Sequence, residues 1–127
     1  MATANSTVKA VLNHLLQNGG GKSKIIEEWR EGSEWYRVWS NGLIEQGGVA
    51  NVSGGLSAVS LKKPFSDTQY HVSATVHENE LGSAVLGVKY SVTRTKKTTE
   101  FTLKVTWAAN GSSIIESGKL TWMAIGF

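Results

Sequence analysis

The chain of 127 residues contains no cysteine, a single proline and a single aspartate, Asp67. Without cysteine it can form neither a disulfide nor a thiolate metal site. Aspartate is a common calcium ligand and catalytic carboxylate, so its near absence leaves few residues for such sites. No apolar run approaches the roughly 18 residues of a membrane span, and no signal peptide opens the chain. We therefore expect a protein that is made in a cytoplasm and does not insert into a membrane.

The charge of the chain is mild. Thirteen Lys and Arg stand against ten Asp and Glu, a formal net charge of +3. The basic residues are scattered, whereas nucleic-acid-binding domains concentrate them on one face, so we expect no nucleic-acid partner. The length suits one domain with a substantial core, and five Trp with fourteen Gly fit a sheet protein with many tight turns.

The first segment, residues 5–18, is predicted to be a short amphipathic helix. Its apolar residues follow helical spacing at Val8, Val11, Leu12, Leu15 and Leu16. A helix of this length must pack against something to be stable, either copies of itself in a coiled coil or its own sheet. Three glycines, 19–21, follow as a joint. We therefore divide the chain into residues 1–23, helix and joint, and residues 24–127, a β domain.

Alternation with a period of two dominates the rest of the chain and predicts half-buried antiparallel strands. One strand alternates at Tyr70, Val72, Ala74 and Val76, and another at Phe101, Leu103, Val105 and Trp107. The last eight residues, 120–127, form an apolar strand. An apolar terminus normally lies within a sheet. We predict an all-β fold, an antiparallel β-sandwich of about eight strands preceded by the helix.

Residues 34–48 are predicted to form a β-hairpin around Asn41-Gly42, the dipeptide that best tolerates a type I′ turn. A two-residue turn places Trp39 opposite Ile44 and Arg37 opposite Gln46. One face then carries Trp35, Arg37, Trp39, Ile44 and Gln46, and the other carries Tyr36, Val38, Leu43 and Glu45. Since both faces mix aromatic and charged residues, we expect burial on both sides, by the core and by a partner subunit.

No residue pattern specifies a catalytic, cofactor or metal site. Gly21-Lys22-Ser23 lacks the earlier glycine of a phosphate-binding loop, because Leu16 stands at that position. His71 and His77 lie about 20 Å apart along an extended strand, too far to share a metal. Asp67 sits in a turn, where aspartate usually caps backbone amides. We expect no enzymatic activity.

Arg37 and Trp107 have two possible roles each. Arg37 between Trp35 and Trp39 fits a structural cation–π contact better than a polar interface network. Trp107 precedes a small polar loop, residues 108–113, and an indole beside Asn and Ser side chains is a common way to grip a sugar. For Trp107 itself we favour the role of last core residue of its strand, and we keep the loop as a ligand candidate.

Three segments together resemble one family. Residues 35–48, WYRVWSNGLIEQGG, resemble the YR-x-x-S-x-G-x-x-EQGG signature of C-terminal domains of tailed-bacteriophage tail fibres. Residues 63–70, KPFSDTQY, are similar to that family's PF-x-D-x-x-Y step into a central strand. Residues 122–127, WMAIGF, are similar to its terminal W-x-A-x-G strand. The resemblance spans about residues 24 to 127.

This resemblance implies a homotrimeric β-sandwich tip at the distal end of a virion's tail fibre, joined to a fibre shaft, with the helix as the end of a stem. It also implies a bacterial receptor, either lipopolysaccharide or another glycan, or an outer-membrane protein. The trimer would bury the second face of the hairpin, so the structural or interface candidates are Trp35, Arg37, Trp39, Glu45 and Gln46. Receptor contacts are expected on exposed loops, with the candidates His77, Glu78, Asn79, Glu80, Trp107, Asn110, Gly111, Ser112 and Ser113.

Two other functions stay open at this stage. The domain could drive trimerisation of a fibre without binding a receptor, or it could be a glycan-degrading enzyme of the tailspike kind. The chain lacks a shaft and a virion-attachment region, so it is either a fragment or a separate tip subunit.

Overall fold

The computed structural model describes residues 23–79, 88–107, 113–114 and 116–127. The expected helix at residues 5–18 lies outside the described residues. Within the described ranges no helix has the length and hydropathy of a membrane span. The same ranges contain nine antiparallel strands: β1 (Ile25–Glu31), β2 (Glu34–Trp39), β3 (Ile44–Ser53), β4 (Leu56–Ser60), β5 (His71–Asn79), β6 (Val88–Lys96), β7 (Glu100–Trp107), β8 (Ser113–Ile114) and β9 (Ser117–Gly126).

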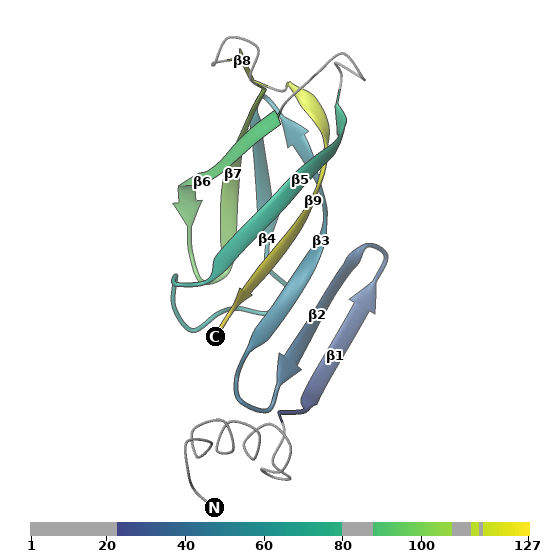
Figure 1. The fold of residues 1–127 in the computed structure, drawn as a ribbon, viewed down its shortest axis with the longest axis vertical. Coiled ribbons are helices and arrows are strands. Elements are labelled where there is room, and N and C mark those ends of the chain that lie inside the picture. The colour runs from purple at the N-terminus through teal and green to yellow at the C-terminus, as the bar shows by residue number, and fades with distance from the viewer. Residues whose placement is uncertain (1–22, 80–87, 108–112, 115) are drawn as a thin grey trace, which may run out of the picture.

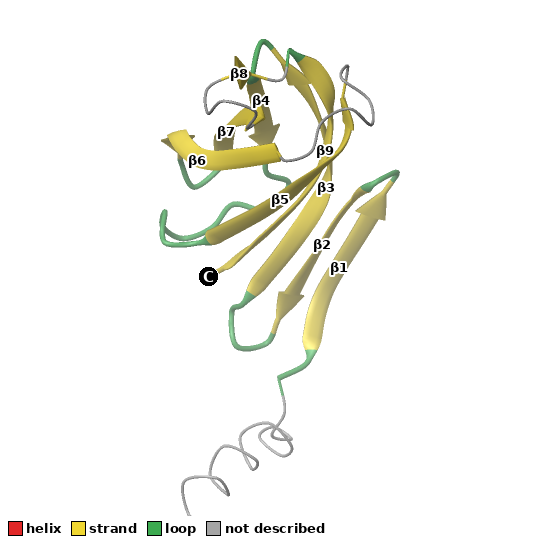
Figure 2. Ribbon diagram, turned by 45° about the horizontal axis from the view of Figure 1, so that its top comes forward, coloured by secondary structure: helices red, strands yellow, loops and turns green. Residues whose placement is uncertain are grey.

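These strands form one hydrogen-bonded sheet that bends into two layers. One layer has the order β1-β2-β3-β9-β5, and the other has β4-β7-β6, with β8 pairing on β7. The layers join at the β3–β4 hairpin, where Ser53 pairs with Leu56. The strands curl so that β4, β7 and β6 lie across from β3, β9 and β5 (Figures 1 and 2). The predicted all-β antiparallel fold is confirmed.

The core lies between the two layers and follows the two-residue period of the strands. Phe101, Leu103 and Val105 of β7 are fully buried, while Lys104 between them is exposed. On β9, Leu120, Trp122 and Ala124 are buried and their neighbours are exposed or half-buried. Alternate residues of a strand point to opposite faces, so this pattern defines one dry and one outward face for each layer. The predicted alternation of β7 is therefore confirmed for these residues.

A column of aromatic rings crosses the core. Phe65 stacks on Tyr70 with ring centroids 4.2 Å apart, and Phe101 packs edge-on against Trp122 at 5.4 Å. Tyr70 lies between these pairs, with its ring 6.5 Å from Phe101. Its hydroxyl donates a hydrogen bond to the Lys97 carbonyl at 2.6 Å. Burial raises the pKa of Tyr70 to about 12, with a smaller contribution from the charge of Glu100.

The register of the β2–β3 hairpin corrects the prediction by one residue. Tyr36 pairs with Gln46 and Val38 with Ile44, so Arg37 lies opposite Glu45 rather than Gln46. The turn has three residues instead of two: Trp39 N–H bonds the Leu43 carbonyl, and Gly42 adopts a φ of 94°. A three-residue loop with a glycine in this left-handed conformation is the next most common hairpin connection.

This shift exchanges the faces of β3, because one residue of slippage moves every side chain to the other side. Ile44 and Gln46 join Tyr36 and Val38 on the inner face, and both are buried. Leu43 and Glu45 lie on the outward face, with Arg37. The predicted two-residue turn had placed them on the face of Tyr36 and Val38. The outward residues of the hairpin are Trp35, Arg37, Trp39, Leu43 and Glu45.

The buried hydroxyl of Tyr70 predicts a loss of stability in alkali. Unfolded tyrosine ionises near pH 10 and the folded residue near pH 12. Between these values the unfolded state releases its proton first, so the free energy of unfolding should fall by up to about 3 kcal/mol as pH rises. Urea titrations at pH 8 to 12 would measure this.

The matched control for that experiment is Tyr70→Phe, which keeps the ring and the other titrating groups. It should be less stable than the original protein at pH 8, and the difference should shrink as pH rises through 10. A difference that stays constant up to pH 12 would contradict the assignment.

Candidate functional site

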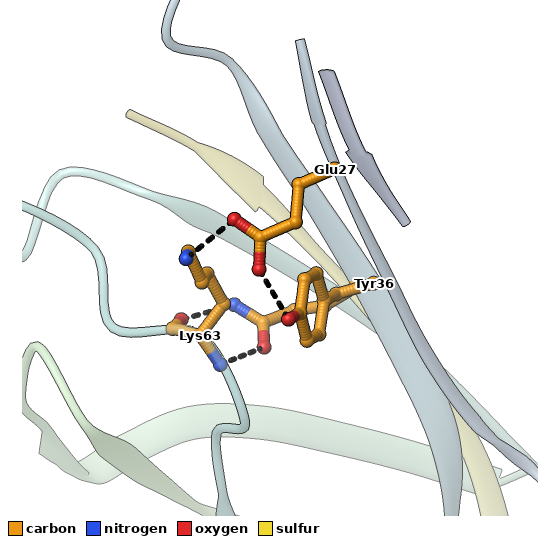
Figure 3. Close-up of polar contacts among 4 residues, drawn as sticks. Glu27, Tyr36 and Lys63 are labelled. Carbon is orange, nitrogen blue, oxygen red and sulfur yellow. Dashed lines mark hydrogen bonds and ion pairs between the residues drawn. The ribbon is translucent and has the colours of Figure 1, made fainter. Parts of the chain in front are cut away.

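A polar cluster ties the β1–β2 hairpin to the rest of the domain (Figure 3). The Tyr36 hydroxyl donates to Glu27 Oε2 at 2.5 Å, and Lys63 Nζ lies 2.9 Å from Glu27 Oε1. Gln46 is only 1% exposed and makes two bonds to the Lys63 backbone: its Nε2 donates to the carbonyl at 2.7 Å, and its Oε1 accepts the N–H at 3.1 Å. The segment after β4 is thereby fixed to β1, β2 and β3 at once.

The hydrogen bonds within this cluster shift the pKa values of its members. The bond from Tyr36, and then that from Lys63, lower the pKa of Glu27, while the bond to Glu27 raises the pKa of both Tyr36 and Lys63. Since the folded-state pKa of Glu27 is depressed, its contribution to stability is present above the unfolded pKa and is lost as pH falls through the folded value. Glu27 is exposed, Tyr36 and Lys63 are half-buried, and the bonds of the cluster fix the position of the segment after β4 against the β1–β2 hairpin.

The outward side of the β1–β2–β3 region combines indoles with charges. The Arg37 guanidinium carbon lies 5.3 Å from the ring centroid of Trp35, which is the predicted cation–π arrangement. Trp39 Nε1 donates to Glu45 Oε1 at 2.6 Å. Among the described residues Arg37 has no ion-pair partner. A shallow hollow of about 360 Å³ lies over this hairpin, lined by Glu28, Trp29, Arg30, Trp35, Tyr36 and Arg37.

Apolar side chains continue this outward surface across β3 and β9. Val49 and Met123 are 37% and 36% exposed, and Ile125, opposite Glu45, is half-buried. We call this surface the outer face and define it by Trp35, Arg37, Trp39, Glu45, Val49, Met123 and Ile125. Of the residues predicted to lie at the subunit interface, Gln46 lies instead on the inner side of the sheet, and its described bonds are within the subunit.

The Gly47-Gly48 pair is explained by the two indoles that cross β3. A Cβ on Gly47 would lie 2.7 Å from the Trp122 carbonyl oxygen and 3.0 Å from the Trp35 ring. A Cβ on Gly48 would lie 3.0 Å from Glu34 Cγ and 3.4 Å from Trp122 Nε1. The two glycines therefore allow Trp35 on the outer side and Trp122 on the inner side to pack directly against the strand.

The loop candidates flank one end of the domain. His77, Glu78 and Asn79 close β5, while Trp107 ends β7 and pairs with Ser113 of β8. These strand ends lie at the end of the molecule opposite to Phe127 and the start of β1 (Figure 1). The remaining candidates lie outside the described residues: Glu80, Asn110, Gly111 and Ser112.

Asp67 has the role predicted for it, because its Oδ1 accepts the Gln69 N–H at 2.8 Å and closes a turn. Among the described residues, no three His, Asp or Glu side chains are grouped as metal ligands. The sequence interpretation missed Glu27 and Lys63 as partners. They are 36 positions apart, and no local pattern links residues so distant in the chain.

Comparison with known protein families matches residues 37–127 to the family described as "Putative tail fiber protein gp53-like, C-terminal". The match covers more than two thirds of the chain, so the chain belongs to this family. It is a C-terminal domain of a tail fibre, as the sequence resemblance implied. A comparison with curated proteins found no match.

Solved structures of pyocin tail fibres share the fold. An N-truncated R1-type pyocin tail fibre matches with a TM-score of 0.57 and 18% identity over 100% of this chain and 98% of that one. An N-truncated R2-type fibre gives 0.57 and 16% identity, and the C-terminal part of the Pseudomonas aeruginosa R2 pyocin fibre gives 0.53 and 15%. The chain covers 44% and 30% of these two R2 structures, respectively.

Removing the Gln46 side-chain bonds should destabilise the domain. Gln46→Leu keeps the volume but leaves the Lys63 N–H and carbonyl without partners, so we expect the free energy of unfolding to fall by about 2–3 kcal/mol. Urea denaturation at fixed protein concentration measures this. Gln69→Leu, the same substitution at an exposed site, should change it by less than about 0.5 kcal/mol. Equal midpoints for both variants would contradict the structural role of Gln46.

Proposed function

We propose that this domain is the distal, receptor-binding tip of a homotrimeric tail fibre, which attaches the virion to a glycan such as lipopolysaccharide on the bacterial surface. Membership of the tail-fibre family and the pyocin-fibre fold support the setting. The proposed role is attachment without catalysis. The main observation in favour of a trimer is the composition of the outer face. The position of the loop candidates favours receptor binding.

The outer face has the composition of a subunit contact. Val49 of β3 and Met123 of β9 are large apolar side chains that are partly exposed to solvent, and the two strands are adjacent in the sheet. Beside them, Arg37 lies on the Trp35 ring, and Trp39 is held by Glu45. Tryptophan, methionine and arginine are the residues enriched at the centres of protein interfaces. A second and third copy of the chain would bury this surface and supply partners for Arg37.

The arrangement of the ends supports receptor binding. In a fibre whose shaft precedes this domain, the shaft enters beside the start of β1. The strands that carry the loop candidates end at the other extremity (Figure 1). Residues around Asn79 and Trp107 would then face the cell. Three copies per fibre would raise the overall affinity through multivalency even where each site is weak.

A purely structural trimerisation domain is the second candidate, and the outer face alone would suffice for it. Only binding to cells separates the two functions, because both require the same subunit contact. A glycan-degrading activity is the third possibility, and it would show as shortened surface polysaccharide.

The trimer is tested by sedimentation. We expect the purified chain to sediment as a trimer at micromolar concentration, and Met123→Glu to sediment as a monomer because a carboxylate would be buried in an apolar contact. Lys104→Glu, on the exposed side of the other layer, should remain a trimer. A monomeric original protein would exclude both the tip and the trimerisation functions.

Receptor binding is tested on susceptible bacteria. The fluorescently labelled domain should bind the cells and should compete with phage adsorption, while electrophoresis shows surface polysaccharide of unchanged length. A stable trimer that does not bind cells would favour the trimerisation function. Shortened polysaccharide after incubation would favour the enzyme.

A further inference from the structure

The sheet opens along one edge of β3. β9 pairs with β3 over its whole length, but the opposite edge is paired with β2 only as far as Gly47 and with β4 only at Ser53. Between these points, at residues 48–52, no strand of the described part of the chain pairs with this edge of β3. A hollow of about 330 Å³ lies there. This volume is at the lower end of the range of small-ligand sites, about 300–1,000 Å³.

The hollow has an apolar floor and a polar rim. The floor and walls are formed by Val49, Ala50, Ala58, Val59 and Trp122. The rim carries a carboxylate, an amide, a hydroxyl and an ammonium group, from Glu34, Asn51, Ser60 and Lys62. Three of these four residues are exposed and Glu34 is half-exposed, so their polar groups are available to a ligand.

Trp122 contributes its indole to the wall of this hollow. The residue as a whole is only 4% exposed. Trp122 Nε1 lies close to Gly48, at the position where Glu34 also approaches the strand. The donor is therefore on the side of the hollow. An indole N–H at the wall of a hollow is a donor only, so it suits an acceptor oxygen of a ligand.

Lys62 and Glu34 lie close enough on the rim for one ligand group to contact both side chains. Lys62 Nζ lies 3.7 Å from Glu34 Oε1, beyond hydrogen-bond distance, and both side chains are partly exposed. Such an exposed pair contributes about 0–1 kcal/mol, so a ligand group can separate it at little cost. A hydroxyl group suits this position because it accepts from the ammonium and donates to the carboxylate at once. The rim has no net charge, which disfavours a strongly anionic or cationic ligand.

Side chains of the domain already bond some backbone groups at the open edge of β3. This argues against a peptide that binds there as an additional strand. Ser33 Oγ accepts a bond from Val49 N–H at 3.4 Å, and Ser57 Oγ donates to the Asn51 carbonyl at 2.8 Å. An added strand would need these same backbone groups. The Val49 carbonyl and the Asn51 N–H point to the same edge as those groups, because both groups of a strand residue point the same way. Within the described ranges, no strand pairs with them on that side.

We propose that this hollow binds a saccharide ring, with Trp122 N–H, Asn51, Ser60, Lys62 and Glu34 contacting its hydroxyl groups. The site is distinct from the loop candidates at the ends of β5 and β7, and Val49 is the one residue of its lining that also belongs to the outer face as defined above. It depends on the proposed function only for the source of the saccharide, a bacterial surface glycan. Carbohydrate ligands present many groups that both donate and accept hydrogen bonds, and the rim offers both kinds of partner.

The test follows the five tryptophan indole N–H signals of the full, ¹⁵N-labelled protein during titration with four sugars: D-glucose, L-rhamnose, N-acetyl-D-glucosamine and D-glucuronic acid. At least one sugar should shift the Trp122 signal saturably at up to about 100 mM. Lys62→Ala and Asn51→Ala should each weaken that affinity by about tenfold, from the loss of a hydrogen bond to the ligand. Lys104→Ala, an exposed lysine on β7, should leave it unchanged.

The substituted residues Asn51 and Lys62 are exposed, so these variants are expected to fold. The absence of a saturable Trp122 shift with all four sugars would overturn the proposal, as would a shift that both variants leave intact. Cell binding separates the two proposals. Sugar binding without cell binding removes the receptor function and leaves this site, whereas cell binding without a Trp122 shift removes this site and leaves the receptor function.

Discussion

The ladder between β3 and β9 is the constraint on which the other parts of this domain depend. Ten consecutive residue pairs, from Ile44–Gly126 to Ser53–Ser117, hold the two strands together. β9 carries β5 on its other edge, while β3 carries β2 and then leads into β4. Both layers, the outer face and the open edge beside Gly48 are therefore positioned by one pairing. Gly47 and Gly48 keep it free of side chains where the two indoles cross.

Much of this architecture follows from the sequence because it rests on local rules. The two-residue alternation identifies the buried side of β7, and it places the terminal apolar segment within the sheet. The cation–π contact of Arg37 and the turn role of Asp67 follow from neighbours in the chain. The family follows from short motifs in their order, and the family match confirms it.

The errors and omissions arise where the structure depends on a choice between similar local geometries or on distant residues. Asn41-Gly42 fits a two-residue and a three-residue loop almost equally, and only the burial of Ile44 and Gln46 decides between them. The Glu27–Lys63 contact and the hollow beside Trp122 join segments that are far apart in the chain. No periodicity within one strand contains that information, since register and curvature are properties of the assembled sheet.

The β3–β9 ladder also determines the order of events when the chain is made. Ile44 of β3 pairs with Gly126 of β9, and these two residues are 82 positions apart in the chain (126 − 44). At a synthesis rate of about 5–20 residues per second, the edge of β3 waits roughly 4–16 s for its partner. During that interval an unpaired strand is exposed next to identical chains on neighbouring ribosomes, where it can pair wrongly. Pairing of strands so far apart in the chain also raises the contact order, which slows folding.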